Sequence, residues 1–187
     1  MSESTPRLAK RHPGDLDADQ RRVYDAIAGG RRAQGPQLFA LTDDQGRLEG
    51  PFNAFLVQPR LGGALQAVGS AIRYETELSD RAREIAILVV AVHWSSAFEW
   101  HAHEAVGRHV GLSGEELQAI RERAYAGLPA QERVVADTAA LLAAEGDLDD
   151  AAYDRALDAL GEAGLFELTT LVGYYATLAL QLRVFRV

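Results

Sequence analysis

The chain has 187 residues, of which 48% are hydrophobic and 25% are charged, and its formal net charge is −8. A chain of this length and composition fits one globular domain with a full hydrophobic core. The negative charge argues against nucleic acid as a partner, because phosphate backbones select basic surfaces. The longest apolar run, Ile85 to Val92, is far shorter than the roughly 20 residues needed to span a bilayer, so we expect no membrane partner.

The sequence contains no cysteine. Disulfides, a thiolate nucleophile, Cys-ligated zinc and iron–sulfur clusters are therefore excluded. The stretch 1–16 is polar and has no apolar segment of the kind found in secretory signals. We expect a cytoplasmic protein with a flexible N-terminal lead over residues 1–16 and a single helical domain over residues 17–187.

The N-terminal part of the chain has the sequence patterns of one helix followed by less regular structure. A first helix is predicted over Asp17–Ala28, with an aspartate near its start and Gly29-Gly30 at its end. Two short apolar pieces then flank the turn-forming stretch 42–46, which indicates a small β-hairpin near residues 37–48.

From Pro59 onward the pattern is that of consecutive helices, which indicates an all-α fold class. Pro59 suits the first turn of a helix, and Ser113 with Glu116 has the spacing of a capping box. The segment 81–94 is apolar on nearly every side, as in a buried central helix. The predicted helices cover 59–74, 81–94, 96–110, 113–125, 129–144, 149–160 and 165–185.

One helical stripe combines two ionisable side chains with apolar ones. At 100° per residue, Glu99 and His103 fall on a stripe that is otherwise apolar, one turn apart, so both are predicted to face the core. A buried carboxylate and a buried imidazole each need a partner, and the pKa values of such pairs move easily.

A second buried carboxylate is predicted on the neighbouring helix. Glu84 lies on a helix with almost no polar side, where a carboxylate is costly unless it is paired or hydrogen-bonded. If the two helices form a hairpin about a tight turn at 95–96, Glu84 approaches His103. Glu84, Glu99 and His103 are therefore the candidate catalytic residues, because they form the acid/base grouping of a proton-transfer site.

A purely structural role also fits these residues. Ser96 and Glu99 have the spacing of a capping box, and Glu84 suits the first turn of its helix through the helix dipole. His103 fits a hydrogen-bonded core histidine equally well. Spacing alone does not choose between the structural and the catalytic roles.

Three motifs carry a family resemblance. They are Arg83-Glu84-Ile85-Ala86-Ile87-Leu88-Val89-Val90-Ala91, Glu99-Trp100-x-x-His103-Glu104 and Gly111-Leu112-Ser113-x-Glu115-Glu116-Leu117. Together they resemble the carboxymuconolactone decarboxylase family, which shares its fold with the alkylhydroperoxidase D-like proteins. The resemblance covers roughly residues 50–185 and implies an alkylhydroperoxidase D-like helical domain with a less regular N-terminal extension.

The same resemblance narrows the chemistry. The peroxidase branch uses a Glu, a Cys-x-x-Cys pair and a His, whose positions hold Glu84, Ser96, Glu99 and His103 in this chain. Its redox cycle needs two sulfurs, and Ser96 and Glu99 supply none, so the chain is not a thiol peroxidase. The resemblance then implies the decarboxylase branch, in which a Glu one turn before the His is familiar. Glu84 is a departure from the shorter bacterial decarboxylases.

The resemblance implies a cofactor-independent lyase that acts by acid/base chemistry on a small anionic carbonyl or lactone compound. His103 is the expected proton donor, and Glu99 is its orienting or proton-relaying partner. Ser96, at a helix N-terminus, is expected to hold an anionic group. Trp100 and Tyr174 are the other expected substrate contacts, although packing is an alternative role for both.

No cofactor and no metal are expected. His101 and His103 point to different faces of one helix, which does not suit a shared metal ion. We expect a homo-oligomer, as a dimer, trimer or hexamer, because the central helices carry apolar and tryptophan side chains suited to a subunit interface and the resembled family is oligomeric.

Two other functions remain open. One is an isomerase or dehydratase that uses the same pocket, and the other is a non-catalytic oligomeric binding protein. A closed apolar pocket around Glu84, Glu99 and His103 favours an enzyme. Tight packing with backbone caps on these side chains favours a binding protein.

Overall fold

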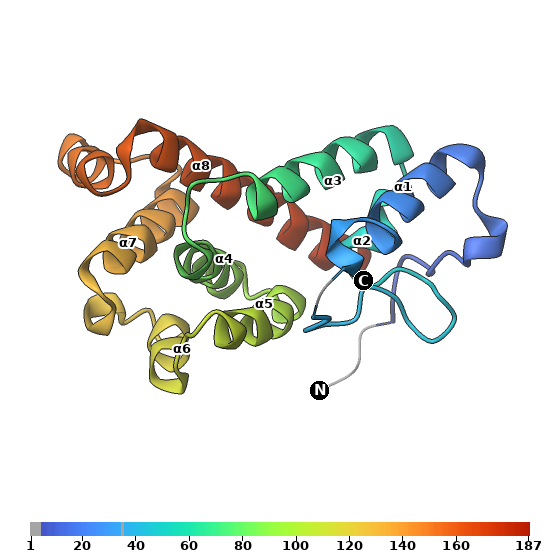
Figure 1. Cartoon of the computed structure of the whole chain (residues 1–187), viewed down its shortest axis with the longest axis horizontal. Coiled ribbons are helices and arrows are strands. Elements are labelled where there is room, and N and C mark those ends of the chain that lie inside the picture. Colours follow the sequence, from blue (N-terminus) through green and yellow to red (C-terminus); the bar gives the residue numbers. More distant parts are fainter. Residues whose placement is uncertain (1–4, 35) are drawn as a thin grey trace. The chain divides into compact units, whose positions relative to one another are not determined.

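The computed structural model describes residues 5–34 and 36–187, and over these ranges it contains helices and loops but no β-strand (Figure 1). The all-α class is confirmed. Contacts divide the chain into two compact units, one formed by Met1–Ala71 with Leu180–Val187 and the other by Ile72–Ala179. Residues 1–4 of the predicted flexible lead lie outside the described residues.

The first unit contains the helices α1 (Ala18–Ala28), α2 (Pro51–Phe55) and most of α3 (Pro59–Tyr74). Asp17 caps α1, and its carboxylate accepts hydrogen bonds from the backbone N–H groups of Asp19 and Gln20. The side chain of Gln20 in turn accepts from the Asp17 backbone, which completes a capping box. Two 3₁₀ turns, Pro13–Asp15 and Arg31–Ala33, flank α1.

The predicted hairpin near residues 37–48 is reduced to one antiparallel bridge, between Thr42 and Leu48. Asp43 explains the difference. Its carboxylate accepts hydrogen bonds from the backbone N–H groups of Gln45 and Arg47, at 3.0 and 2.9 Å. These bonds hold the turn itself, and the pairing beside it is limited to a few backbone hydrogen bonds, such as the one from the Glu49 N–H to the Leu41 carbonyl at 2.9 Å.

The second unit is built around α4 (Asp80–Trp94), which packs against α5 (Ala97–His109), α6 (Gly114–Arg121) and α7 (Ala130–Glu145). Ser79 caps α4 by accepting a hydrogen bond from the Ala82 N–H. Every residue from Ala82 to Ala91 is buried. The predicted buried central helix is therefore present, and its polar members must find partners inside the protein.

One helix end differs from the predicted one. α6 ends at Arg121, not near residue 125, because Arg123 adopts a left-handed backbone with φ of 59°. The predicted break between the two last helices is present, because α8 (Asp150–Phe185) consists of two helices that meet at non-helical backbone at Gly161. The capping box of Ser113 and Glu116 is present as predicted.

α8 is the one helix among the described residues that is long and apolar enough to cross a membrane, judged by length and composition only. Half of the residues in the most apolar stretch of α8 are buried inside the protein. Since the core helix of a soluble protein passes the same test, this feature is weak evidence for a membrane span.

Arg81 connects three segments of the second unit. Its guanidinium donates to both oxygens of Glu132 at 2.8 and 2.9 Å, to Glu116 at 2.8 Å, and to the Gly111 carbonyl. The hydrogen bonds to Glu132, and then to Glu116, raise the pKa of Arg81 further above its ordinary value. Arg81 is therefore engaged in holding α4, α6 and α7 together.

Replacement of Arg81 tests this structural role. Arg81→Gln should lower the free energy of unfolding by about 2 kcal/mol, because Glu116 and Glu132 lose charge-assisted hydrogen bonds. Urea denaturation measures the loss. Arg22→Gln is the matched control, since the Arg22 side chain is 72% exposed and pairs with Asp19 on the same helix, and it should change stability by less than about 0.5 kcal/mol. Equal effects in the two variants would contradict the assigned role.

Candidate acid/base site

The site lies between α4 and α5, which form a helical hairpin. Ser95 ends α4 in a left-handed conformation with φ of 52° and ψ of 41°, and the Ser96 N–H donates to the Ala91 carbonyl at 2.9 Å. α5 begins at the next residue, Ala97. A turn this short makes the two helices antiparallel, and Figure 1 shows them as neighbours.

This hairpin brings Glu84 and His103 together. Oε2 of Glu84 lies 2.7 Å from Nδ1 of His103, and the two residues are 1% and 7% exposed. With Glu84 as a carboxylate, Nδ1 carries the hydrogen and donates it, and Nε2 is the nitrogen that can exchange a proton. The contact therefore orients the imidazole and selects its tautomer.

Two tyrosines of α8 pack beside this pair. The Tyr175 ring stands edge-on to the His103 imidazole, with centroids 5.2 Å apart, and Tyr174 packs edge-on to Tyr175 at 5.3 Å. Sequence reasoning named Tyr174 as a substrate contact, whereas the ring against the imidazole belongs to Tyr175. The apolar helix pattern gives no signal that would separate these two neighbours.

Glu99 is buried in a different environment. It is 2% exposed, and among the described residues neither of its carboxyl oxygens has a hydrogen-bond partner. Burial raises its pKa to about 8, and the nearby Ser96 hydroxyl offsets this in part. The carboxyl of Glu99 is therefore largely protonated at neutral pH.

Ser96 does not cap α5 with its side chain. Its hydroxyl is buried and bonds to no backbone N–H at the start of α5; the polar group that it influences is the carboxyl of Glu99. The capping-box interpretation of Ser96 and Glu99 is thus not realised, because neither side chain reaches the backbone group that such a box would use.

The other sequence candidates lie elsewhere. Nε1 of Trp100 donates to Glu104 at 2.8 Å, and the Arg121 guanidinium lies 4.3 Å from the centre of the indole ring. His101 is exposed. Across residues 5–34 and 36–187, no group of three His, Asp or Glu side chains is arranged to hold a metal ion.

A cavity of about 500 Å³ lies in the same unit but is lined by other residues. Its α4 members are Val89 and His93, and His93 lies about 180° around the helix from Glu84. Glu84, Glu99 and His103 do not line it. All three side chains are buried, and His103 is the most exposed of them at 7%.

These features define a class of protein. A small helical unit carries an oriented Glu–His pair and a protonated carboxyl on adjacent helices, which is a set of groups suited to moving protons. The sequence pattern of the carboxymuconolactone decarboxylase family matches residues 59–145. This span includes Glu84, Glu99 and His103. This segment of the chain belongs to that family. No curated protein shows significant sequence similarity to the chain.

The raised pKa of Glu99 predicts how stability depends on pH. Between the ordinary pKa of 4.5 and about 8, the folded protein keeps a proton that the unfolded chain has released. The contribution of Glu99 to the free energy of unfolding therefore falls as the pH rises through this window, by up to about 1.4 kcal/mol per pH unit. Glu99→Gln should remove this slope, as measured by urea denaturation across the window.

Glu104→Gln is the matched control for this measurement. Glu104 lies on the same helix, but its pKa is lowered, first by its hydrogen bond to Arg108. In Glu104→Gln, the free energy of unfolding should therefore still fall as the pH rises from 4.5 to about 8, as in the wild-type protein. Parallel pH curves for wild-type protein and Glu99→Gln would mean that Glu99 is ionised in the folded state.

Proposed function

We propose that this protein is a cofactor-independent, carboxymuconolactone decarboxylase-like lyase that acts on a small anionic carbonyl or lactone compound. The observation that carries the proposal is the buried hydrogen bond between Glu84 and His103, one helical turn from the protonated Glu99. The family match over residues 59–145 supports the same class of chemistry.

The reaction sets three requirements. When carbon dioxide leaves a γ-carboxylated unsaturated lactone, the electron pair of the broken bond spreads into the ring as an extended enolate. The enzyme must orient the leaving carboxylate, stabilise the enolate and return a proton to carbon. In this proposal, Nε2 of His103 first takes up a proton from Glu99 and then delivers it to carbon, while Glu84 holds the imidazole in the required orientation.

Glu99 acts as a neutral acid in the proposed mechanism. A protonated carboxyl in an apolar site donates a hydrogen bond to a developing enolate oxygen without the desolvation cost of a second charge. Glu99 can also pass its proton toward His103, which lies one turn further along α5. Ser96, at the start of α5, is the proposed contact for an anionic group of the substrate.

One observation supports catalysis over a non-catalytic binding role. A carboxyl kept only for structure is expected to be firmly hydrogen-bonded, whereas the carboxyl of Glu99 makes no hydrogen bond of normal geometry among the described residues and is influenced only in part by the Ser96 hydroxyl. An isomerase or dehydratase would use the same proton transfers, so it remains the alternative within the same site. The cytoplasmic location is likewise a proposal, based on the cysteine-free, acidic sequence.

His103 gives the direct test. His103→Gln should lower the release of carbon dioxide from γ-carboxymuconolactone by about 100-fold or more, because the amide cannot carry the proton. NMR of the substrate and product measures the loss. His101→Gln is the matched control, since His101 lies on the same helix but is exposed, and its activity should stay within about two-fold of wild type.

Two results would refute the role of His103. One is a fully active His103→Gln protein, and the other is an equal loss of activity in both variants. No turnover of this lactone by the wild-type protein, together with isomerisation or dehydration of a related acid that requires His103, would favour the alternative enzyme.

We also propose that the protein assembles as a homo-oligomer. On α8, Phe166 is 72% exposed, and the exposed residues Thr169 and Gly173, three and seven positions further along, are uncharged and lie on the same side of the helix. An exposed apolar side chain on such a helix face suits contact with a second copy. Light scattering at micromolar concentration should give the mass of a dimer or a larger oligomer. Phe166→Glu should weaken the association between subunits and lower this mass. A mass near the monomer value of 20.3 kDa for wild type would contradict this proposal.

A further inference from the structure

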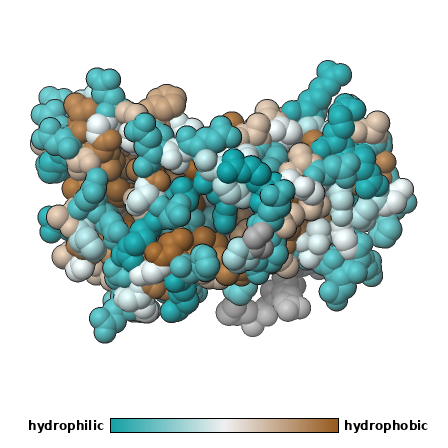
Figure 2. Space-filling view, in the orientation of Figure 1, coloured by the Kyte–Doolittle hydropathy of each residue, from teal (hydrophilic) through white to brown (hydrophobic). Residues whose placement is uncertain are grey.

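The cavity of about 500 Å³ in the second unit has the size of a small-ligand site. It lies among α4, the 3₁₀ turn Tyr125–Gly127, α7 and α8. Hydrophobic side chains gather over α7 and the start of α8 on the face shown in Figure 2. We call this cavity the α7 cavity; its lining does not include the acid/base residues on the other side of α4.

The α7 cavity has a buried floor and a charged rim. Val89, Tyr125, Thr138 and Ala152 are 9% exposed or less and supply apolar surface with two hydroxyl groups. The rim residues are exposed, and they are Arg123, Arg133, Asp137, Leu141 and Arg155. A floor that excludes water beneath a rim of charges suits a ligand with an apolar body and an ionised group.

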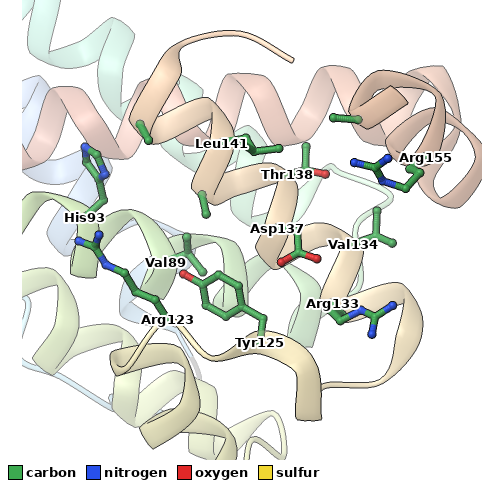
Figure 3. A pocket seen from close by; sticks show the side chains of 13 residues that line it. Val89, His93, Arg123, Tyr125, Arg133, Val134, Asp137, Thr138, Leu141 and Arg155 are labelled. Atoms are coloured by element: carbon green, nitrogen blue, oxygen red, sulfur yellow. The ribbon is translucent and has the colours of Figure 1, made fainter. Parts of the chain in front are cut away.

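The charge of the rim is opposite to that of the whole chain. Three arginines and one aspartate line the cavity, whereas the chain has a formal net charge of −8. Figure 3 shows Arg123 and His93 on one side of the cavity and Arg133 and Arg155 on the other. Such a local excess of guanidinium groups attracts an anion.

The guanidinium groups of the three rim arginines make no contacts that stabilise the fold in the described part of the chain. Among the described residues, no hydrogen bond, ion pair or ring contact engages the guanidinium of Arg123, Arg133 or Arg155. Arg81 and Arg108, by contrast, are held by carboxylates. The rim arginines therefore retain donors suited to a carboxylate ligand.

Arg123 occupies a backbone position that favours glycine. It follows the C-cap of α6 with φ of 59°, and the N–H of the next residue, Ala124, donates to the Ala119 carbonyl at 2.8 Å. A side chain in this left-handed conformation costs about 1 kcal/mol relative to glycine. The chain nevertheless places a long cationic side chain here, at the rim of the cavity.

We propose that the α7 cavity binds a small organic carboxylate with an apolar body, at a site separate from Glu84 and His103. The arginines of the rim hold the carboxylate, and Val89, Tyr125 and Ala152 contact the apolar body. Thr138 and Asp137 are placed to hydrogen-bond a hydroxyl group of the ligand.

Isothermal titration of the full chain tests this proposal with benzoate, and with benzyl alcohol as a neutral molecule of similar size. Benzoate should bind with a Kd of about 1 mM, as expected for a ligand of this size, and benzyl alcohol at least about ten-fold more weakly. Arg123→Gln and Arg155→Gln should each weaken benzoate binding by about five- to ten-fold, because each removes a charge-assisted contact. Arg22→Gln should have no effect, since Arg22 is exposed on α1.

Two further measurements locate the bound benzoate. Backbone amide NMR shifts should change at Val89, Tyr125 and Thr138, and His103→Gln should leave the affinity unchanged. A loss of benzoate binding in His103→Gln but not in Arg123→Gln would place the anion in the acid/base site and overturn the proposal. Equal affinity for benzoate and benzyl alcohol, unchanged affinity in both arginine variants, or no saturable binding of benzoate would also overturn it.

Discussion

The hydrogen bond between Glu84 and His103 is the constraint on which the second unit depends. α4 is buried from Ala82 to Ala91, and a carboxylate inside that stretch is costly unless a partner reaches it within the protein. α5 supplies this partner through the tight turn at Ser95 and Ser96. The pair therefore fixes how α5 sits against α4, because a shift of one residue along the helix would turn the imidazole away by about 100°.

The same constraint separates the roles of the two glutamates. Glu84 has a fixed hydrogen-bond partner in His103. Glu99 makes no hydrogen bond of normal geometry among the described residues, and burial raises its pKa to about 8. Acid/base sites depend on such contrasts between similar groups. The positions that carry two cysteines in the resembled peroxidases hold Ser96 and Glu99 here, so this chain lacks the sulfurs of a redox site and has a hydroxyl and a carboxyl in their place.

Much of this site could be predicted from the sequence, because helical periodicity determines which residues share a face. The apolar stripe of α5 indicated that Glu99 and His103 are buried, and the short turn indicated that Glu84 approaches His103. The contact of Tyr175 with His103 could not be predicted, since α8 is apolar on several faces. The early end of α6 depends on the left-handed backbone of Arg123, and the α7 cavity joins residues that only packing brings together.

The central claim is that Glu84 fixes the tautomer of His103, and ¹⁵N NMR of the imidazole nitrogens measures this directly. The account predicts a neutral ring that carries its hydrogen on Nδ1 and none on Nε2, and a change in this pattern in Glu84→Gln. A neutral ring protonated at Nε2 in the wild-type protein, unchanged in Glu84→Gln, would contradict it. That result would remove both the orienting role of Glu84 and the proposed path of the proton.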